Sequence, residues 1–213
     1  NHVEPVSIES ATVLFTDFVG FTRAAEQVSP AELIRALDAR FSQFDRIADE
    51  HGLEKIKTIG DAYMCAGGLP TPNRTHAVDA ALAALKMRAC IRALRGRDSL
   101  PCDVRIGLHT GPLVAGVIGR KKFSYDIWGD TVNTASRMES AGVADRINIS
   151  AQSFALLDPL FRCIPRGLVE AKGKGRVPMY FLEGIRPELS RDGDGITPSD
   201  DFLAAYEALR RGA

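Results

Sequence analysis

Two aspartates stand where paired carboxylates could bind divalent metal ions. Asp17 follows the apolar run 11–16, and Asp61 lies in the turn Thr58-Ile-Gly-Asp-Ala-Tyr63. An ionised carboxylate at the end of an apolar strand is costly unless something compensates its charge. If the two strands are neighbours, both carboxylates converge on one edge of the sheet and, with a backbone carbonyl, could hold two Mg²⁺ ions. Because aspartate is also common in turns, the spacing alone leaves a purely structural role open.

Three further polar side chains could contact a ligand. Asn133 and Arg137 are four residues apart in the predicted helix 131–140 and so share a face. The guanidinium stays charged and presents a planar fork to phosphate oxygens. Lys172 lies in the glycine-rich run Ala171-Lys-Gly-Lys-Gly175, where backbone and ammonium could approach a ligand closely. Periodicity and composition alone do not distinguish these roles from an exposed amide, a surface ion pair and a solvated turn.

The first strand, 11–16, precedes a helix with clear start and end signals. Ser29 and Glu32 form a capping box, Pro30 takes the first helical position, and Gly52 is the expected end. The predicted apolar face of this helix consists of Leu33, Ile34, Leu37, Phe41, Phe44 and Ile47.

The later elements predict an α+β fold. They are strands 53–59 and 62–66 with a turn at Gly60-Asp61, a helix from 75, strands 104–108 and 113–118 joined by His109-Thr-Gly-Pro112, helix 131–140, strand 147–149, helix 152–157, and strands 161–165 and 177–182. The order βαββαβ, with additional C-terminal strands and a helix, indicates a ferredoxin-like sandwich.

Three segments are predicted along the chain. Residues 10–185 form the main domain, residues 1–9 an N-terminal linker, and residues 186–213 a linker and a C-terminal helix. That helix, 200–211, has Ser199 as its cap and begins acidic and ends basic, which complements the helix dipole. Its apolar residues would dock on the domain or on a partner, and the sequence leaves both open. They are Phe202, Tyr206 and Leu209.

Composition is that of a globular protein and narrows the choice of partners. Lys+Arg equals Asp+Glu at 27 each, which argues against a generic nucleic-acid or membrane-surface binder. No apolar stretch reaches the ~20 residues of a membrane span, and the first residues lack a signal-peptide pattern. We therefore expect a cytoplasmic domain, with any membrane or regulatory tether outside this fragment. Scattered thiols without metal-ligand spacing are expected at Cys65, Cys90, Cys102 and Cys163.

Four segments, in order over about residues 10–184, closely resemble the class III adenylate/guanylate cyclase family. They are Val13-Leu-Phe-Thr-Asp-Phe-Val-Gly-Phe-Thr22, Lys55-Ile-Lys-Thr-Ile-Gly-Asp-Ala-Tyr-Met64, Arg105-Ile-Gly-Leu-His-Thr-Gly111 and Tyr125-Asp-Ile-Trp-Gly-Asp-Thr-Val-Asn-Thr-Ala-Ser-Arg-Met138. The resemblance implies that Asp17, Asp61 and the Phe18 carbonyl hold two Mg²⁺ or Mn²⁺ ions for phosphoryl transfer.

The resemblance also implies roles for the remaining polar residues. Asn133 would orient the ribose, and Arg137 would stabilise the α-phosphate in the transition state. Lys172, chosen over Lys174 by alignment only, would reach the terminal phosphates. Some family members carry a basic residue where this chain has Pro112, so phosphate binding is expected to depend more on Arg137 and Lys172.

Lys57 and Asp126 align with the family residues that contact the purine. A lysine donor and an aspartate acceptor match the N1 acceptor and N6 amino group of adenine, whereas guanine has the opposite polarity. Guanylate cyclases of the family typically carry Glu and Cys at these places. ATP is therefore the expected substrate, although 129–140 as a whole is similar to guanylate cyclases. The same two side chains could also simply pair with each other.

In the family, the metal-binding and nucleotide-binding residues meet across a subunit interface. This chain carries both sets, so a head-to-tail homodimer with two shared sites is expected. The alternatives are a guanylate or dual-specificity cyclase and a non-catalytic nucleotide-binding dimerisation module. Degenerate modules usually lose a metal aspartate or the Asn and Arg, and all four are present here.

Overall fold

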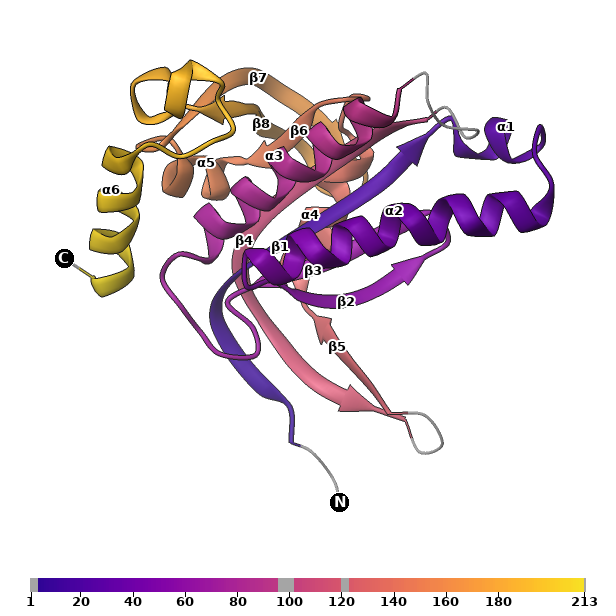
Figure 1. Ribbon diagram of the computed structural model, residues 1–213. Coiled ribbons are helices and arrows are strands. Elements are labelled where there is room, and N and C mark those ends of the chain that lie inside the picture. The colour runs from indigo at the N-terminus through magenta and orange to yellow at the C-terminus, as the bar shows by residue number, and fades with distance from the viewer. Residues whose placement is uncertain (1–3, 96–101, 120–122, 213) are drawn as a thin grey trace.

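The computed structural model describes residues 4–95, 102–119 and 123–212 of the chain (Figure 1). The elements in chain order are β1 Val6–Val19, α1 Phe21–Ala25, α2 Pro30–Glu50, β2 Glu54–Ile59, β3 Ala62–Gly67, α3 His76–Leu94, β4 Asp103–Ile118, β5 Ser124–Trp128, α4 Asp130–Ser140, β6 Ile147–Ser150, α5 Ala151–Leu157, β7 Phe161–Ala171, β8 Gly175–Ile185, η1 Pro187–Leu189, η2 Arg191–Gly193 and α6 Asp200–Arg211. The fold is mixed α+β.

The predicted ferredoxin-like arrangement is confirmed. The sheet runs β2-β3-β1-β4-β6-β8-β7, with β5 paired to β4, and α2 and α3 lie side by side on one face of it (Figure 1). The first four strands in this order, β2-β3-β1-β4, form two interlocking βαβ units, β1-α2-β2 and β3-α3-β4. The pairing of β4 with β6 is parallel, and β8 and β7 extend the sheet in antiparallel fashion.

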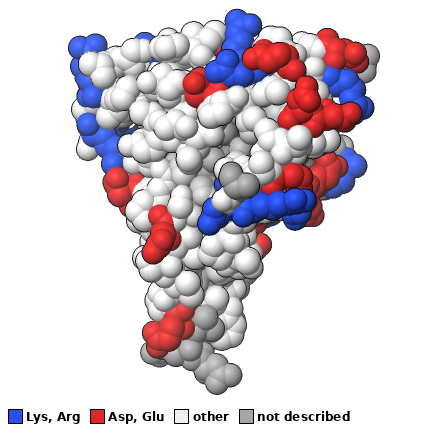
Figure 2. All heavy atoms as spheres, turned by 90° about the vertical axis from the view of Figure 1, so that its left-hand side faces the viewer, with Lys and Arg blue, Asp and Glu red and all other residues white. Residues whose placement is uncertain are grey.

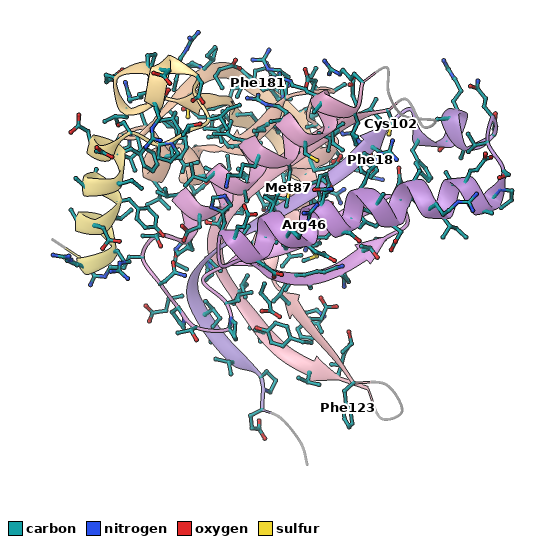
Figure 3. The ribbon with its side chains drawn as sticks, viewed as in Figure 1. Phe18, Arg46, Met87, Cys102, Phe123 and Phe181 are labelled. Carbon is teal, nitrogen blue, oxygen red and sulfur yellow. The ribbon has the colours of Figure 1, made fainter. Side chains whose placement is uncertain are left out.

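The main core lies between the sheet and helices α2 and α3. Phe18, on β1, is 2% exposed and stacks 6.0 Å from Phe44 of α2. Figure 3 labels Phe18 and, on α3, Met87 in this layer. A smaller apolar cluster on the opposite face of the sheet includes Ala135 of α4. Burial on both faces of the sheet explains why the centre of β1 is an almost continuous apolar run.

Helix α2 begins and ends as predicted. The Ser29 hydroxyl accepts the Glu32 N–H at 3.3 Å, and the Glu32 carboxylate accepts the Ser29 N–H at 3.0 Å. Gly52 follows the helix with φ +62°. The prediction for Ile34 was wrong, because its side chain is 66% exposed. The N-terminal end of α2 extends past the sheet (Figure 1), whereas Leu37, about one turn after Ile34, already packs against the core.

The predicted hairpin 104–118 was wrong, because these residues form the single strand β4. Proline usually disfavours a central strand, because it has no N–H to donate to a neighbouring strand. Pro112 is tolerated because it lies opposite the irregularity of β1 between Ile8 and Ala11, where the pairing is already interrupted. The true hairpin partner is β5, which the sequence did not predict as a strand. We call residues 113–118 and 124–128 the arm, because this hairpin projects from the sheet (Figure 1).

Strand β1 begins at Val6, inside the segment 1–9 predicted as a linker, and residues 1–3 lie outside the described residues. The helix 200–211 is present as α6, capped by Ser199 as predicted. It docks on the domain: Phe202 is fully buried against Phe161, and the Tyr206 hydroxyl donates to Asp79 of α3 at 2.8 Å.

Cys65, Cys90 and Cys163 are free thiols, as expected. No helix in the described ranges is long and apolar enough to cross a membrane.

Candidate active site

The two predicted metal-binding aspartates lie on neighbouring strands. Asp17 is inside β1, two residues before its end, rather than directly after it. Asp61 is in the β2–β3 turn, and β1 and β3 pair antiparallel with Thr16 opposite Tyr63. Both aspartates and Phe18 line one open pocket of about 650 Å³.

Negative charge accumulates in this pocket. Burial, and next the nearby Asp61 carboxylate, raise the pKa of Asp17 above its ordinary value. The Arg105 guanidinium opposes this shift, and its Nη2 donates to Asp17 Oδ2 at 3.0 Å. Two close carboxylates with one guanidinium are still short of positive charge, which a bound cation would supply.

The donor set fits hard divalent cations. Two carboxylates and the Phe18 carbonyl are oxygen ligands of the kind that Mg²⁺ prefers, and Mg²⁺ completes its shell with water and substrate phosphates. In the described part of the chain, no three His, Cys, Asp or Glu side chains cluster with metal-ligand spacing. An ion held here would therefore depend on ligands from outside the chain as well.

The predicted purine-contacting residues lie together at a second place. Lys57 of β2 donates from Nζ to Asp126 Oδ2 of β5 at 2.5 Å. The Lys57 side chain is 41% exposed and that of Asp126 is 12% exposed. The Ile127 N–H donates a hydrogen bond to the other carboxylate oxygen of Asp126, Oδ1, at 2.9 Å. The pair therefore presents a donor and an oriented acceptor to the same space.

The residues predicted to contact the ribose and the phosphates lie on α4 and in the turn between β7 and β8. Asn133 is exposed and Arg137 half-buried one turn later. Lys172 is exposed in the turn between β7 and β8. Lys174 is instead committed to Asp130 at the start of α4, with its Nζ 2.7 Å from both carboxylate oxygens. The structure thus distinguishes the two lysines: Lys174 is held by Asp130, whereas Lys172 is exposed.

Two charged residues beside Asp17 were missed by sequence reasoning, Arg105 directly and Glu139 through Arg105. Arg105 pairs directly across from Asp17 in the β1–β4 ladder and lines the pocket. Its Nε donates to Glu139 Oε1, at the end of α4, at 2.6 Å. Arg105 opens one of the motifs recognised in the sequence, but only the strand register places it beside Asp17.

The pocket contains only one of the two predicted sets of residues. Its lining comprises Asp17, Phe18, Asp61, Arg105 and residues 19–23. The second set, Lys57, Asp126, Asn133, Arg137 and Lys172, is absent from that lining. Within the described residues of one chain, the two predicted sets therefore do not share this pocket.

These motifs and this geometry match one family of proteins over most of the chain. Residues 3–184 match the adenylate and guanylate cyclase catalytic domain. The chain belongs to this family. The cyclase domain is 44% identical over 176 residues to an adenylate cyclase of Mycobacterium tuberculosis, covering 83% of this chain and 40% of that protein. It is 43% identical over 176 residues to the human guanylate cyclase soluble subunit beta-2, covering 82% of this chain and 28% of that protein.

The cyclase domain also resembles a solved structure that binds a nucleotide analogue. This is the catalytic core of a rhodopsin-guanylyl cyclase with converted specificity, in complex with ATPαS. The two share a TM-score of 0.79 and 37% sequence identity, over 84% of this chain and 97% of the other. The relatives include adenylate and guanylate cyclases, so the comparison establishes a cyclase domain without choosing the base.

Proposed function

We propose that this cyclase domain converts ATP to 3′,5′-cyclic AMP and pyrophosphate in two sites shared between two copies of the chain. The observation that supports the proposal is that Asp17, Phe18 and Asp61 line one pocket, which the paired Lys57 and Asp126 do not line. A head-to-tail dimer would bring the metal half of one chain to the nucleotide half of its partner, twice.

Asp17, Asp61 and the Phe18 carbonyl would hold two divalent ions. When bound, such ions lower the pKa of the ribose 3′-hydroxyl and neutralise charge on the departing pyrophosphate. The protein's own contribution is to hold the oxygen donors in a fixed array on β1 and the β2–β3 turn. Arg105 lies beside them and adds a fixed positive charge near the phosphates.

The α4 residues would act on the reacting groups. Asn133 would hold the ribose so that its 3′-oxygen faces the α-phosphorus in line, and Arg137 would stabilise charge on the α-phosphate in the transition state. Lys172 would bind the terminal phosphates. A bond forms between the ribose 3′-oxygen and the α-phosphorus. The bond from the α-phosphorus to the oxygen that bridges to the β-phosphate breaks, which releases pyrophosphate, and the hydroxyl proton passes to solvent.

The Lys57–Asp126 pair supports adenine. The lysine can donate to N1 while Asp126, held by the Ile127 N–H, accepts from the N6 amino group. Guanine would place an acceptor and a donor against the wrong partners. GTP is the competing substrate because the human relative is a guanylate cyclase subunit. Assays with ATP and GTP, each with Mg²⁺ or Mn²⁺, decide this: cyclic AMP should dominate, and equal or greater cyclic GMP formation would refute ATP specificity.

The arm supports a dimer. Asp126, which is buried, is the one charged residue of the arm, and the narrow lower part of the molecule is mostly white in Figure 2. Phe123, next to β5, points away from the domain (Figure 3). Exposed apolar residues grouped on a projecting hairpin are typical of a protein interface. They are Val114, Ile118, Phe123 and Trp128.

Mixing variants tests the shared site. Asp17→Ala and Arg137→Ala chains should each be inactive alone. Together they should recover activity, because one interface of the heterodimer then has every group. Heterodimers carrying two different affinity tags should be purified first, so that absence of recovery in them directly refutes shared sites. A non-catalytic module would form no cyclic nucleotide under any of these conditions.

A further inference from the structure

Glu139 holds the Arg105 guanidinium at the edge of the pocket lined by Asp17 and Asp61, which is the proposed metal pocket. Arg105 Nε donates to Glu139 at 2.6 Å, while its Nη2 donates to Asp17 Oδ2 at 3.0 Å. The Glu139 side chain is 11% exposed, against 26% for Arg105 and 27% for Asp17. The guanidinium is thus anchored on its buried side and reaches the pocket with one remaining edge.

The backbone around this pair is shaped to fix it. The end of α4 packs so closely on β4 that a Cβ at Gly107 would lie 2.1 Å from the Glu139 nitrogen. A Cβ at Gly142 would lie 2.8 Å from Cγ of Arg105, so the alkyl stem of Arg105 rests against that glycine. Both glycines therefore allow α4 to approach the strand, and this sets the position of Glu139 relative to the guanidinium.

Arg105 competes with metal for Asp17. A guanidinium with no other partner can grip a carboxylate through two parallel hydrogen bonds and occupy both of its oxygens. Here Nε is committed to Glu139, and the single bond to Asp17 uses Oδ2. Glu139 also balances the charge of Arg105 from the side away from the pocket, which weakens the attraction between Arg105 and Asp17.

We propose that Glu139 is a positioning residue that acts through Arg105: it holds the guanidinium so that Asp17 stays available to a divalent cation. This inference rests on the proposed metal role of Asp17 and Asp61. Glu139 itself would not touch the nucleotide, because it is buried behind Arg105.

The test measures Mn²⁺ binding directly, by electron paramagnetic resonance of free Mn²⁺ in titrations of the metal alone into the whole chain. Glu139→Gln should weaken Mn²⁺ binding about three- to ten-fold, because Arg105 then pairs with Asp17 only. Arg105→Gln should tighten binding, and adding Glu139→Gln to it should have no further effect. The matched control is Glu183→Gln, which removes a glutamate paired with Arg146 away from the pocket and should leave binding unchanged.

The outcomes separate the two proposals. No Mn²⁺ binding by the wild-type chain would overturn the metal site and this inference together. Wild-type binding that Glu139→Gln leaves intact would overturn only the role of Glu139. An equal loss with and without Arg105 would also overturn it, because the effect would then be structural. Circular dichroism and thermal melting of each variant verify that the fold is retained.

Discussion

At the scale of single residues, Lys57 and Asp126 make base selection testable. Lys57→Glu with Asp126→Cys reverses the hydrogen-bonding polarity of the pair, so the ratio of kcat/KM for ATP over GTP should fall by at least about 10²-fold. Steady-state assays with both nucleotides measure this ratio. Lys55→Glu is the matched control, because Lys55 lies on the same strand but binds Asp45. A double variant that keeps its preference for ATP would contradict the assigned role.

The ionised Asp17 carboxylate should lower the free energy of unfolding of the metal-free protein. Its folded pKa is raised, chiefly by burial and then by Asp61, above the ordinary 3.8. The folded state therefore binds its proton more tightly than the unfolded state. The penalty is absent below about pH 3.8, grows as pH rises through the raised pKa, and is complete at neutral pH. Asp17→Asn should then raise the metal-free melting temperature at pH 7 on the order of 2–4 °C, the change that ~1 kcal/mol produces in a domain of this size.

Calorimetry across pH checks this prediction. The gain should shrink as pH falls toward 3.8, and added Mn²⁺ should stabilise the wild-type chain but not the variant. The control is Asp145→Asn. Burial opposes the charge of Asp145, but hydrogen bonds from Arg92 and Arg95 lower its pKa overall, so this variant should lose stability instead. A lower melting temperature for Asp17→Asn would contradict the account.

Residue types indicated the chemistry of the site, but not all of its members. Asp17 and Asp61 stood out because carboxylates beside apolar strands need compensation, and their strands are neighbours in the sheet. Arg105 and Glu139 did not stand out, since an arginine in a strand and a glutamate in a helix are individually ordinary. Only the register of β1 on β4, and the close approach of α4 to Gly107, bring these charges together.

At the scale of elements, α6 is held by one buried side chain. Phe202 is fully buried and meets Phe161 edge-on at 5.7 Å, so Phe202→Ala should lower the free energy of unfolding by about 3–5 kcal/mol. Chemical denaturation measures the loss. Leu203→Ala, at the next residue, changes a side chain that is 47% exposed and should have an effect within about 0.5 kcal/mol. Equal effects of the two substitutions would show that α6 is not anchored as described.

Helices were predicted more accurately than strands, for a physical reason. The limits of α2 and α6 follow from local signals, a capping box and a serine cap, that their own residues supply. The path of β4 does not. Pro112 indicates a turn in isolation, and it is accommodated only because β1 is irregular opposite it. β5 likewise becomes a strand through its partner β4, which lies outside any local window.

At the scale of the whole molecule, the proposed shared site would make the effect of a residue depend on which chain carries it. Arg105, Glu139 and Asp17 are paired within one chain and would serve its metal half. Glu139 also lies in the last turn of α4, whose Arg137 would serve the other site of the dimer. In a homodimer these two effects cannot be told apart, because every change is made in both halves.

A heterodimer with a single intact site separates them. One chain carries Arg137→Ala and supplies the metals, and the other carries Asp17→Ala and supplies Arg137. Glu139→Gln in the first chain should raise the Mn²⁺ concentration needed for half-maximal rate and leave kcat unchanged, because it acts through Arg105 on Asp17. The same substitution in the second chain should leave the Mn²⁺ requirement as it was. If kcat fell only when the second chain carried it, Glu139 would serve α4 and not the metal pocket.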